Sequence, residues 1–262
     1  MVTHWTEKMF LEHGDLFLKF MKRAEKRASK EVEVLEKIFS ELGVHPGDKV
    51  LDLCCGLGRH ALRLVEKGFI VTGIDISPIA IKHAEDLAES MKVKDRVNFL
   101  VGDARKVLKV LKDKQRLFNA SLSMWTSMGY YDDETDRSIL EQLNELTSSA
   151  GVLVVQMGNR DFMVKHLQPF DVADFEDCEL HEHRKLNLEN SRIEGTWKFY
   201  KKNGEKLKHL TTIPVTHRLY SLHELVELLE STGWKYVNSY GNLELQPVTP
   251  DTNMIIIVGK KD

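Results

Sequence analysis

The segment from Lys49 to Met157 alternates short apolar runs with helical patterns, and this alternation constrains the fold more than any other feature. Helices are expected between the runs, and Ser77-Pro78 supplies one of them with an N-cap and a proline at its first position. Strands that alternate with helices form parallel crossover units. The sequence therefore predicts a doubly wound α/β sheet whose ligands lie beyond the carboxyl ends of its strands. The expected strands are KVLDLC, FIVTGID, RVNFLVGD, LFNASLSMW and VLVVQM.

Different patterns flank this segment. Apolar residues at helical spacing predict a helix over Leu16–Leu42 that stops at Gly43. Residues 177–220 alternate in the manner of strands and contain Asn203-Gly204, a strong hairpin signal, so we expect an antiparallel insertion of two or three strands. A capping box at Ser221 then opens a last helix before two final strands. We expect a helical cap (1–45), a main domain (46–175 and 221–262) and a β insertion (176–220) that serves as a lid or a dimer contact.

Composition limits the class of protein. With 42% hydrophobic residues, 29% charged residues and a net charge of −3, the surface as a whole is not basic, so nucleic acid is not an expected partner unless a local basic patch exists. The basic run Lys19–Lys30 is interpreted as a solvated helix face rather than a polyanion site. The first ten residues lack a signal-peptide pattern, and no apolar stretch is as long as a membrane helix. Three cysteines, two of them adjacent, do not form a disulfide framework, so a reduced, cytoplasmic protein is expected.

The stretch VLDLCCGLGRHA (50–61) places two glycines immediately after the first strand. Asp75 ends the second strand, where a carboxylate can accept hydrogen bonds from both ribose hydroxyls of an adenosine cofactor. These features alone do not separate NAD(P) from other adenosine cofactors. Asp52 before the glycines suits a ligand with an ammonium group better than a pyrophosphate, and Asp103 is placed to accept from the adenine amine.

Together, VLDLCCGLG, GIDIS and VGDA resemble the class I S-adenosylmethionine-dependent methyltransferases, and so do the closing segments WKYVNSYG and MIIIVGKK. The resemblance implies a Rossmann-like sheet of seven strands with an antiparallel ending. It also implies that Gly56 and Gly58 admit the methionine part of the cofactor and that Asp52 orients its amine. It assigns the ribose to Asp75 and the adenine to Ile76, Asp103 and Ala104. Cys54 stands where the family commonly has its first glycine, so the resemblance places it among the cofactor-binding residues. We interpret Cys54 and Cys55 as packing residues without a redox or metal role.

The loop after the fourth strand faces the methyl acceptor in this family. It contains no Asn-Pro-Pro-Tyr or Asp-Pro-Pro-Tyr motif and no cysteine nucleophile. Its sequence WTSMGYY resembles the T-S-x-G-Y loop of a subgroup that acts on small amines, amino sugars and peptide N-termini. We therefore expect a small-molecule acceptor, methylated at nitrogen by positioning and desolvation. In this interpretation Ser123, Met124 and Trp125 flank the cofactor, Tyr130 and Tyr131 are the catalytic candidates, and Arg192, Trp197 and Arg218 bind the acceptor from the insertion.

Several alternatives stay open at this level. An RNA or protein methyltransferase requires a basic channel, a non-catalytic protein would bind S-adenosylmethionine without an acceptor pocket, and an NAD(P) oxidoreductase fits Asp52 and Asp103 poorly. His181 and His183 share a strand face but have no third ligand at a recognisable spacing, so no metal is expected. The roles of His60 and His217 are undecided. A homodimer through the insertion and the absence of a membrane partner are further expectations.

Overall fold

The computed structural model describes residues 4–111 and 117–262 and builds this part of the chain around two sheets. The larger sheet has seven strands in the order β10-β11-β5-β4-β1-β2-β3. Strands β1 to β5 are parallel, whereas β11 pairs antiparallel with both β5 and β10. This arrangement confirms the predicted Rossmann-like sheet with its antiparallel ending. The strands are β1 (Lys49–Leu53), β2 (Ile70–Asp75), β3 (Val97–Val101), β4 (Phe118–Ser123), β5 (Thr147–Gly158), β10 (Trp234–Tyr240) and β11 (Met254–Lys261).

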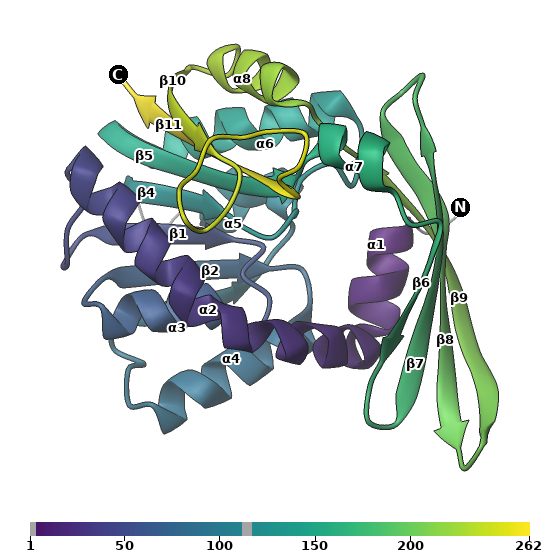
Figure 1. The fold of residues 1–262 in the computed structure, drawn as a ribbon. Coiled ribbons are helices and arrows are strands. Elements are labelled where there is room, and N and C mark those ends of the chain that lie inside the picture. Colours follow the sequence, from purple (N-terminus) through teal and green to yellow (C-terminus); the bar gives the residue numbers. More distant parts are fainter. Residues whose placement is uncertain (1–3, 112–116) are drawn as a thin grey trace.

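Helices cover both faces of the larger sheet (Figure 1). On one face, α2 (Gly14–Leu42), α3 (Arg59–Glu66) and α4 (Pro78–Ser90) enclose one apolar core. On the other, α5 (Val107–Leu111), α6 (Asp133–Leu146) and α8 (Leu222–Glu230) enclose a second. Because both faces are covered, the central strands β1, β2 and β4 are buried along nearly their whole length and their burial does not alternate. The short 3₁₀ turn η2 (Ala104–Lys106) precedes α5, and α7 (Arg160–His166) follows β5.

The predicted helix signals are present. The Ser77 side chain accepts from Ala80 N, Ser221 and Glu224 form the capping box, and Gly43 ends α2 with φ +86°. The main difference lies at the start of β5. The sequence pattern predicts a helix over about Glu134–Ser148, whereas α6 ends at Leu146 and β5 begins at Thr147. Thr147 pairs with Phe118 across an irregularity in the register, so tertiary pairing overrides the helical pattern at this point.

The smaller sheet is antiparallel and has the order β6-β7-β8-β9. Its strands are β6 (Phe170–Asp174), β7 (Cys178–Asn187), β8 (Arg192–Asn203) and β9 (Lys206–Arg218). Two or three strands were expected, and β6 is the additional one. Phe170 and Val172 on β6 are 48% and 40% exposed. This edge strand therefore lacks a buried apolar face, which is the feature that marks a strand in a sequence.

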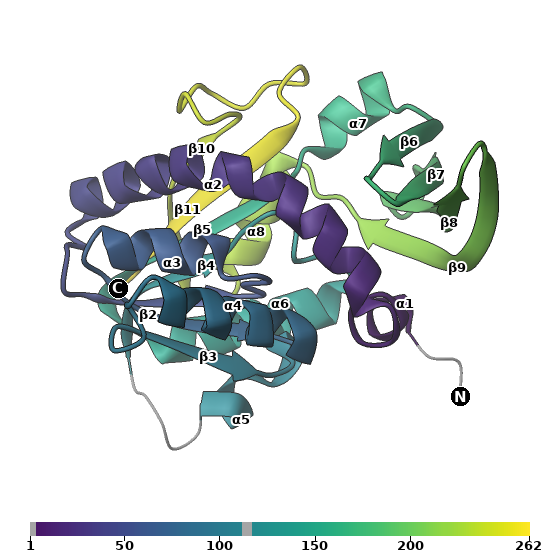
Figure 2. The ribbon, with the colours of Figure 1, turned by 90° about the horizontal axis from the view of Figure 1, so that it is seen from below.

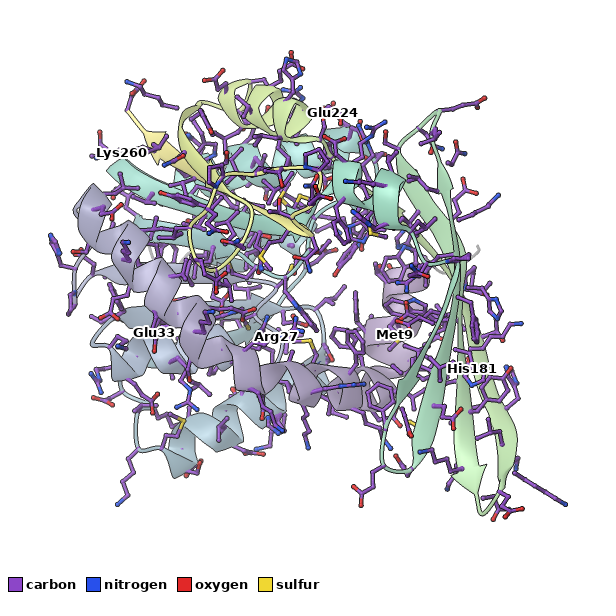
Figure 3. The ribbon with its side chains drawn as sticks, in the orientation of Figure 1. Met9, Arg27, Glu33, His181, Glu224 and Lys260 are labelled. Carbon is purple, nitrogen blue, oxygen red and sulfur yellow. The ribbon has the colours of Figure 1, made fainter. Side chains whose placement is uncertain are left out.

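The N-terminal segment joins the two sheets (Figure 2). It contains α1 (Trp5–Glu7) and a π-helical turn, η1 (Lys8–Glu12), ahead of α2. Met9, which is 1% exposed, belongs to a cluster that includes Phe199 and Ile213 of the smaller sheet (Figure 3). Residues 1–3 of the expected helical cap lie outside the described residues. Within the described ranges, no helix combines the length and apolar character that a membrane crossing requires.

Candidate active site

The glycine loop after β1 is held in a left-handed backbone conformation. Gly56 and Gly58 have φ +54° and +73°, and a Cβ on Gly58 would lie 2.6 Å from the Phe99 ring. Cys54 has φ +61°, so the first glycine of the family pattern is replaced by a residue that adopts the glycine conformation at some energetic cost. Burial raises the pKa values of both the Cys54 and the Cys55 thiols, which disfavours the reactive thiolate form.

A cavity with about 840 Å³ of empty space lies beyond the carboxyl ends of β1, β2 and β4. Of the residues predicted to contact the cofactor, eight line it: Cys54, Gly56, Asp75, Ile76, Asp103, Ala104, Met124 and Trp125. Asp52, Gly58 and Ser123 do not line it. Ser123 is buried in β4 and Gly58 is buried against Phe99, so both lie behind the cavity wall.

Asp75 connects the glycine loop to the start of α4. One of its carboxylate oxygens accepts from Gly56 N and the other from Ser77 N, each at 2.9 Å. The side chain is only 8% exposed, and burial raises the pKa of its carboxyl group. Each oxygen keeps a further lone pair, so the carboxylate can still accept from hydroxyl groups of a ligand in the cavity.

Asp103 is already paired with a cation. Both of its oxygens accept from the Arg105 guanidinium at 2.7–3.0 Å. Burial raises the pKa of Asp103, but the bonds to Arg105 outweigh burial, so the pKa is lowered overall. Arg105 also lies over the Tyr131 ring at 4.3 Å from its centre. Any contact from Asp103 to an adenine amine would therefore use lone pairs that Arg105 leaves free.

Arg59 is a site residue that sequence reasoning missed. It lines the cavity, is 5% exposed, and lies 4.9 Å from the centre of the Trp125 ring. Its Nη1 and the Nε2 of His60 both contact the buried Glu31 carboxylate. Glu31 lies on α2, far from the loop in sequence, so no local pattern indicates the pairing. The position of Arg59 directly after Gly58 was the available signal.

Two buried polar atoms near the loop lack partners among the described residues: Arg59 Nη2 and Asp52 Oδ2. Burial raises the pKa of Asp52 to about 7, against the opposing effect of the Arg59 charge. An unpaired buried donor and an unpaired buried acceptor are costly unless a ligand or water satisfies them. The donor suits a carboxylate and the acceptor suits an ammonium group, which are the two ends of an amino acid.

The loop after β4 is strained. Trp125 and Thr126 have φ +63° and +62°, a conformation that non-glycine residues adopt at a cost. Gln156 on β5 holds them there, since its side-chain oxygen accepts from Trp125 N at 3.2 Å and its carbonyl from Thr126 N at 2.9 Å. The Trp125 ring is thereby fixed against Arg59 at the cavity wall.

Tyr130 and Tyr131 both line the cavity. Tyr130 packs edge-on against Trp5 and against His217, and burial raises the pKa of its hydroxyl far above the usual range. The Tyr131 hydroxyl is 2.9 Å from the Thr6 hydroxyl, so the N-terminal segment closes this end of the cavity. His217 is half-buried against Tyr130 and does not line the cavity, and desolvation lowers its pKa to about 4.

The three insertion residues expected to bind the acceptor do not line the cavity. Arg192 donates to the carbonyl oxygens of Tyr131 and Gly129, which fastens β8 to the tyrosine loop. Arg218 donates to Asp133 and Glu224 at the starts of α6 and α8. Trp197 packs edge-on against Trp5. These side chains thus make contacts that join the two sheets, and none of them lines the cavity.

His181 and His183 lie on β7 next to Phe170, and His181 contacts the Glu179 carboxylate at 2.8 Å. In the part of the chain that the structure describes, no group of three or more His, Cys, Asp or Glu residues is arranged to hold a metal ion.

Comparison with known sequences places the chain among methyltransferases. A family model described as "Methyltransferase domain" matches residues 44–212. A putative ribosomal RNA large subunit methyltransferase from Methanocaldococcus jannaschii is 32% identical over 108 residues, which cover 40% of this chain. The match covers 28% of the length of that protein, and a match to a second such protein from the same organism covers 18% of its length. A glycine/sarcosine N-methyltransferase from Aphanothece halophytica is 24% identical over 90% of this chain and 83% of its own length.

Solved structures share the fold over nearly the whole chain. An S-adenosylmethionine-dependent methyltransferase from Clostridium acetobutylicum has a TM-score of 0.79 at 17% identity, covering 94% of this chain and 99% of its own. A sugar N-methyltransferase from a Streptoalloteichus species has a TM-score of 0.68 at 16% identity, covering 92% of this chain and 91% of its own. An amino pentose methyltransferase from Micromonospora echinaspora, solved with S-adenosylmethionine bound, has a TM-score of 0.64 at 15% identity over 90% of this chain and 92% of its own.

Proposed function

The chain belongs to the S-adenosylmethionine-dependent class I methyltransferases, and from this premise we propose that it methylates an amine nitrogen of a small molecule. The observation that carries the proposal is the cavity, which is bounded by the glycine loop on one side and by Tyr130, Tyr131 and Thr6 on the other. Its lining of apolar and aromatic side chains with a few polar groups is typical of small-molecule sites.

The residues around the cavity fit the cofactor. We assign the ribose hydroxyls to Asp75 and the adenine to Ile76, Asp103 and Ala104. The unpaired Arg59 Nη2 suits the carboxylate of the methionine part. The unpaired Asp52 Oδ2 suits its ammonium group through a bridging water, because Asp52 does not itself line the cavity.

Bound S-adenosylmethionine supplies an electrophilic methyl group on a sulfonium, and the acceptor nitrogen uses its lone pair to displace the sulfur, which keeps the electrons of the broken C–S bond. The protein has to orient the nitrogen, exclude water and let one proton leave the product amine. Trp125 and Tyr130 offer aromatic faces that stabilise cationic groups, whereas the Tyr131 ring already packs against Arg105 and His4. The raised pKa of Tyr130 keeps its hydroxyl protonated, so it acts as a hydrogen-bond partner and not as a base.

We further propose that the N-terminal segment and the smaller sheet together form a lid. The clamp of Arg192 on the tyrosine loop and the contact between Thr6 and Tyr131 support this role. The division into cap, main domain and insertion, a homodimer through the insertion, and a cytoplasmic location stay predictions.

The test combines calorimetric binding of S-adenosylmethionine with transfer of a radiolabelled methyl group to a pool of small amines. Micromolar binding and labelled amine products are expected. Failure of the protein to bind S-adenosylmethionine refutes the proposed cofactor site. Binding without transfer to any amine refutes the amine acceptor, and transfer to RNA or protein in parallel reactions identifies the alternative.

A further inference from the structure

A second pocket shares Trp125 with the cofactor cavity. This outer pocket is formed where the middle of α2 meets the carboxyl end of β5 and the loop between β10 and β11 (Figure 1). It is larger than the cofactor cavity, with about 1160 Å³ of empty space that includes open solvent. Its lining residues are Lys26, Arg27, Lys30, Glu31, Trp125, Thr126, Gln156, Met157, Gly158, Asn242, Leu243, Glu244, Asn253 and Met254.

The charges of the outer pocket are unbalanced. The Glu31 carboxylate already contacts Arg59 and His60, and Glu244 forms an ion pair with Lys30. Lys26 and Arg27 are exposed and form no ion pair or hydrogen bond with any other described residue. Arg27 lies on the stretch of α2 next to the β10–β11 loop (Figure 3). Two cations therefore face the pocket without a carboxylate of the described chain to neutralise them.

The pocket also has unused hydrogen-bonding groups. The side chains of Thr126 and Asn253 have no hydrogen-bond partner within the described ranges. The Gln156 amide nitrogen donates only to the Met254 sulfur, a weak acceptor, at 3.2 Å. Cations combined with free hydroxyl and amide donors are the groups that bind carboxylates and phosphates.

The outer pocket is adjacent to the site of methyl transfer. Trp125 lines both cavities, and its strained backbone is fixed by Gln156, which lines the outer one. A ligand held in the outer pocket thus lies one aromatic ring away from the cofactor cavity. The basic run Lys19–Lys30, interpreted from sequence as a solvated face, is in part the wall of this pocket.

We propose that the outer pocket binds an anionic group of the acceptor, a carboxylate or a phosphate, with Lys26 and Arg27 as its specificity-determining residues. The inference rests on the proposed function, because it takes the acceptor to be a small amine. The amine nitrogen reaches past Trp125 to the cofactor while the anion stays on α2. A phosphorylated amino sugar carries both groups on one small molecule, and an amino acid is the smallest molecule that does so. The cofactor's own carboxylate is the other source of the same chemistry, and the test separates the two.

The test compares three proteins: wild type, Lys26→Gln/Arg27→Gln, and the control Lys22→Gln/Arg23→Gln. The control removes the same charge from exposed positions of the same helix outside the pocket. Initial rates are measured for two matched pairs of amines, glycine with glycinamide and glucosamine 6-phosphate with glucosamine. Binding of the demethylated cofactor and of inorganic phosphate to the cofactor-loaded protein is measured by calorimetry.

For wild type and control we expect the anionic member of at least one pair to have the lower KM. In Lys26→Gln/Arg27→Gln that KM rises at least about tenfold, as does the Kd for phosphate, since charge-assisted contacts are lost. The KM of the neutral member and the cofactor Kd stay within about twofold.

Equal phosphate affinity in all three proteins, or no phosphate binding by wild type, overturns the proposal. A weaker cofactor Kd in Lys26→Gln/Arg27→Gln alone shows that the pocket serves the cofactor's carboxylate and also overturns it. If no amine of any kind is methylated, the proposed amine acceptor fails, while the phosphate measurement still decides whether the outer pocket is an anion site.

Discussion

Replacing Asp75 with alanine tests the cofactor assignment most directly. The carboxylate is 8% exposed, lines the cavity, and accepts one backbone N–H on each oxygen at 2.9 Å. These two bonds fix its position before a ligand arrives, so its remaining lone pairs are oriented at no further entropic cost. Loss of charge-assisted hydrogen bonds to the ribose hydroxyls costs about 1–3 kcal/mol. The Kd for S-adenosylmethionine should therefore rise about 5- to 150-fold.

The same substitution leaves Gly56 N and Ser77 N without their acceptor, so an effect on folding has to be separated from an effect on binding. Calorimetric titration is therefore combined with thermal unfolding of the ligand-free protein. Asp86→Ala is the matched control, because Asp86 is exposed on α4 and contacts only Lys82. Asp75→Asn tests whether an uncharged acceptor suffices. A folded Asp75→Ala variant with the affinity of wild type would refute the ribose assignment.

Three further predictions concern buried groups around the site. Asp52, with its pKa raised to about 7, stays protonated in the folded chain at pH values where the unfolded chain has lost that proton, so its contribution to stability should fall as pH rises from about 4 to 7. His217, with its pKa lowered to about 4, should make the opposite contribution between pH 4 and its ordinary 6.5, so the two slopes largely cancel in the wild type. Chemical unfolding of the ligand-free proteins should therefore show stability that rises more steeply with pH in Asp52→Asn than in wild type, and that falls with pH relative to wild type in His217→Gln. Cys54 at φ +61° should tolerate glycine within about 1 kcal/mol but lose about 1–3 kcal/mol of unfolding free energy as valine, and equal effects of the two would contradict the strain.

The main fold was predictable because its signals are local. Apolar runs, the Ser77 N-cap, the capping box at Ser221 and the Asn203-Gly204 hairpin each depend on neighbouring residues, and all are present in the structure. The start of β5 and strand β6 were not predictable in this way. The start of β5 pairs irregularly, and β6 is an edge strand. The side chains of both segments have little strand-like periodicity, so their conformation depends on pairing with the neighbouring strand.

The chemistry of the glycine loop also follows from sequence. The order of Asp52, the two glycines, Asp75 and Asp103 along the chain fixes their place at the strand ends, since parallel strands bring those ends to one edge of the sheet. Sequence spacing cannot show which of these groups face the cavity. Asp52 and Gly58 turned out to lie behind its wall.

Only the tertiary structure decided what surrounds the loop. Glu31 and the cations of α2 are far from Arg59 and Trp125 in sequence, and they meet because α2 packs over the carboxyl edge of the sheet. In the same way, Arg192 was expected to bind the methyl acceptor. In the structure it instead fastens β8 to the tyrosine loop, because the two segments lie against each other. The sequence by itself determined the fold, which depends on local pattern and strand order, and its resemblance to a known family indicated the cofactor class. The acceptor side is built from contacts between distant segments, and no local pattern encodes those.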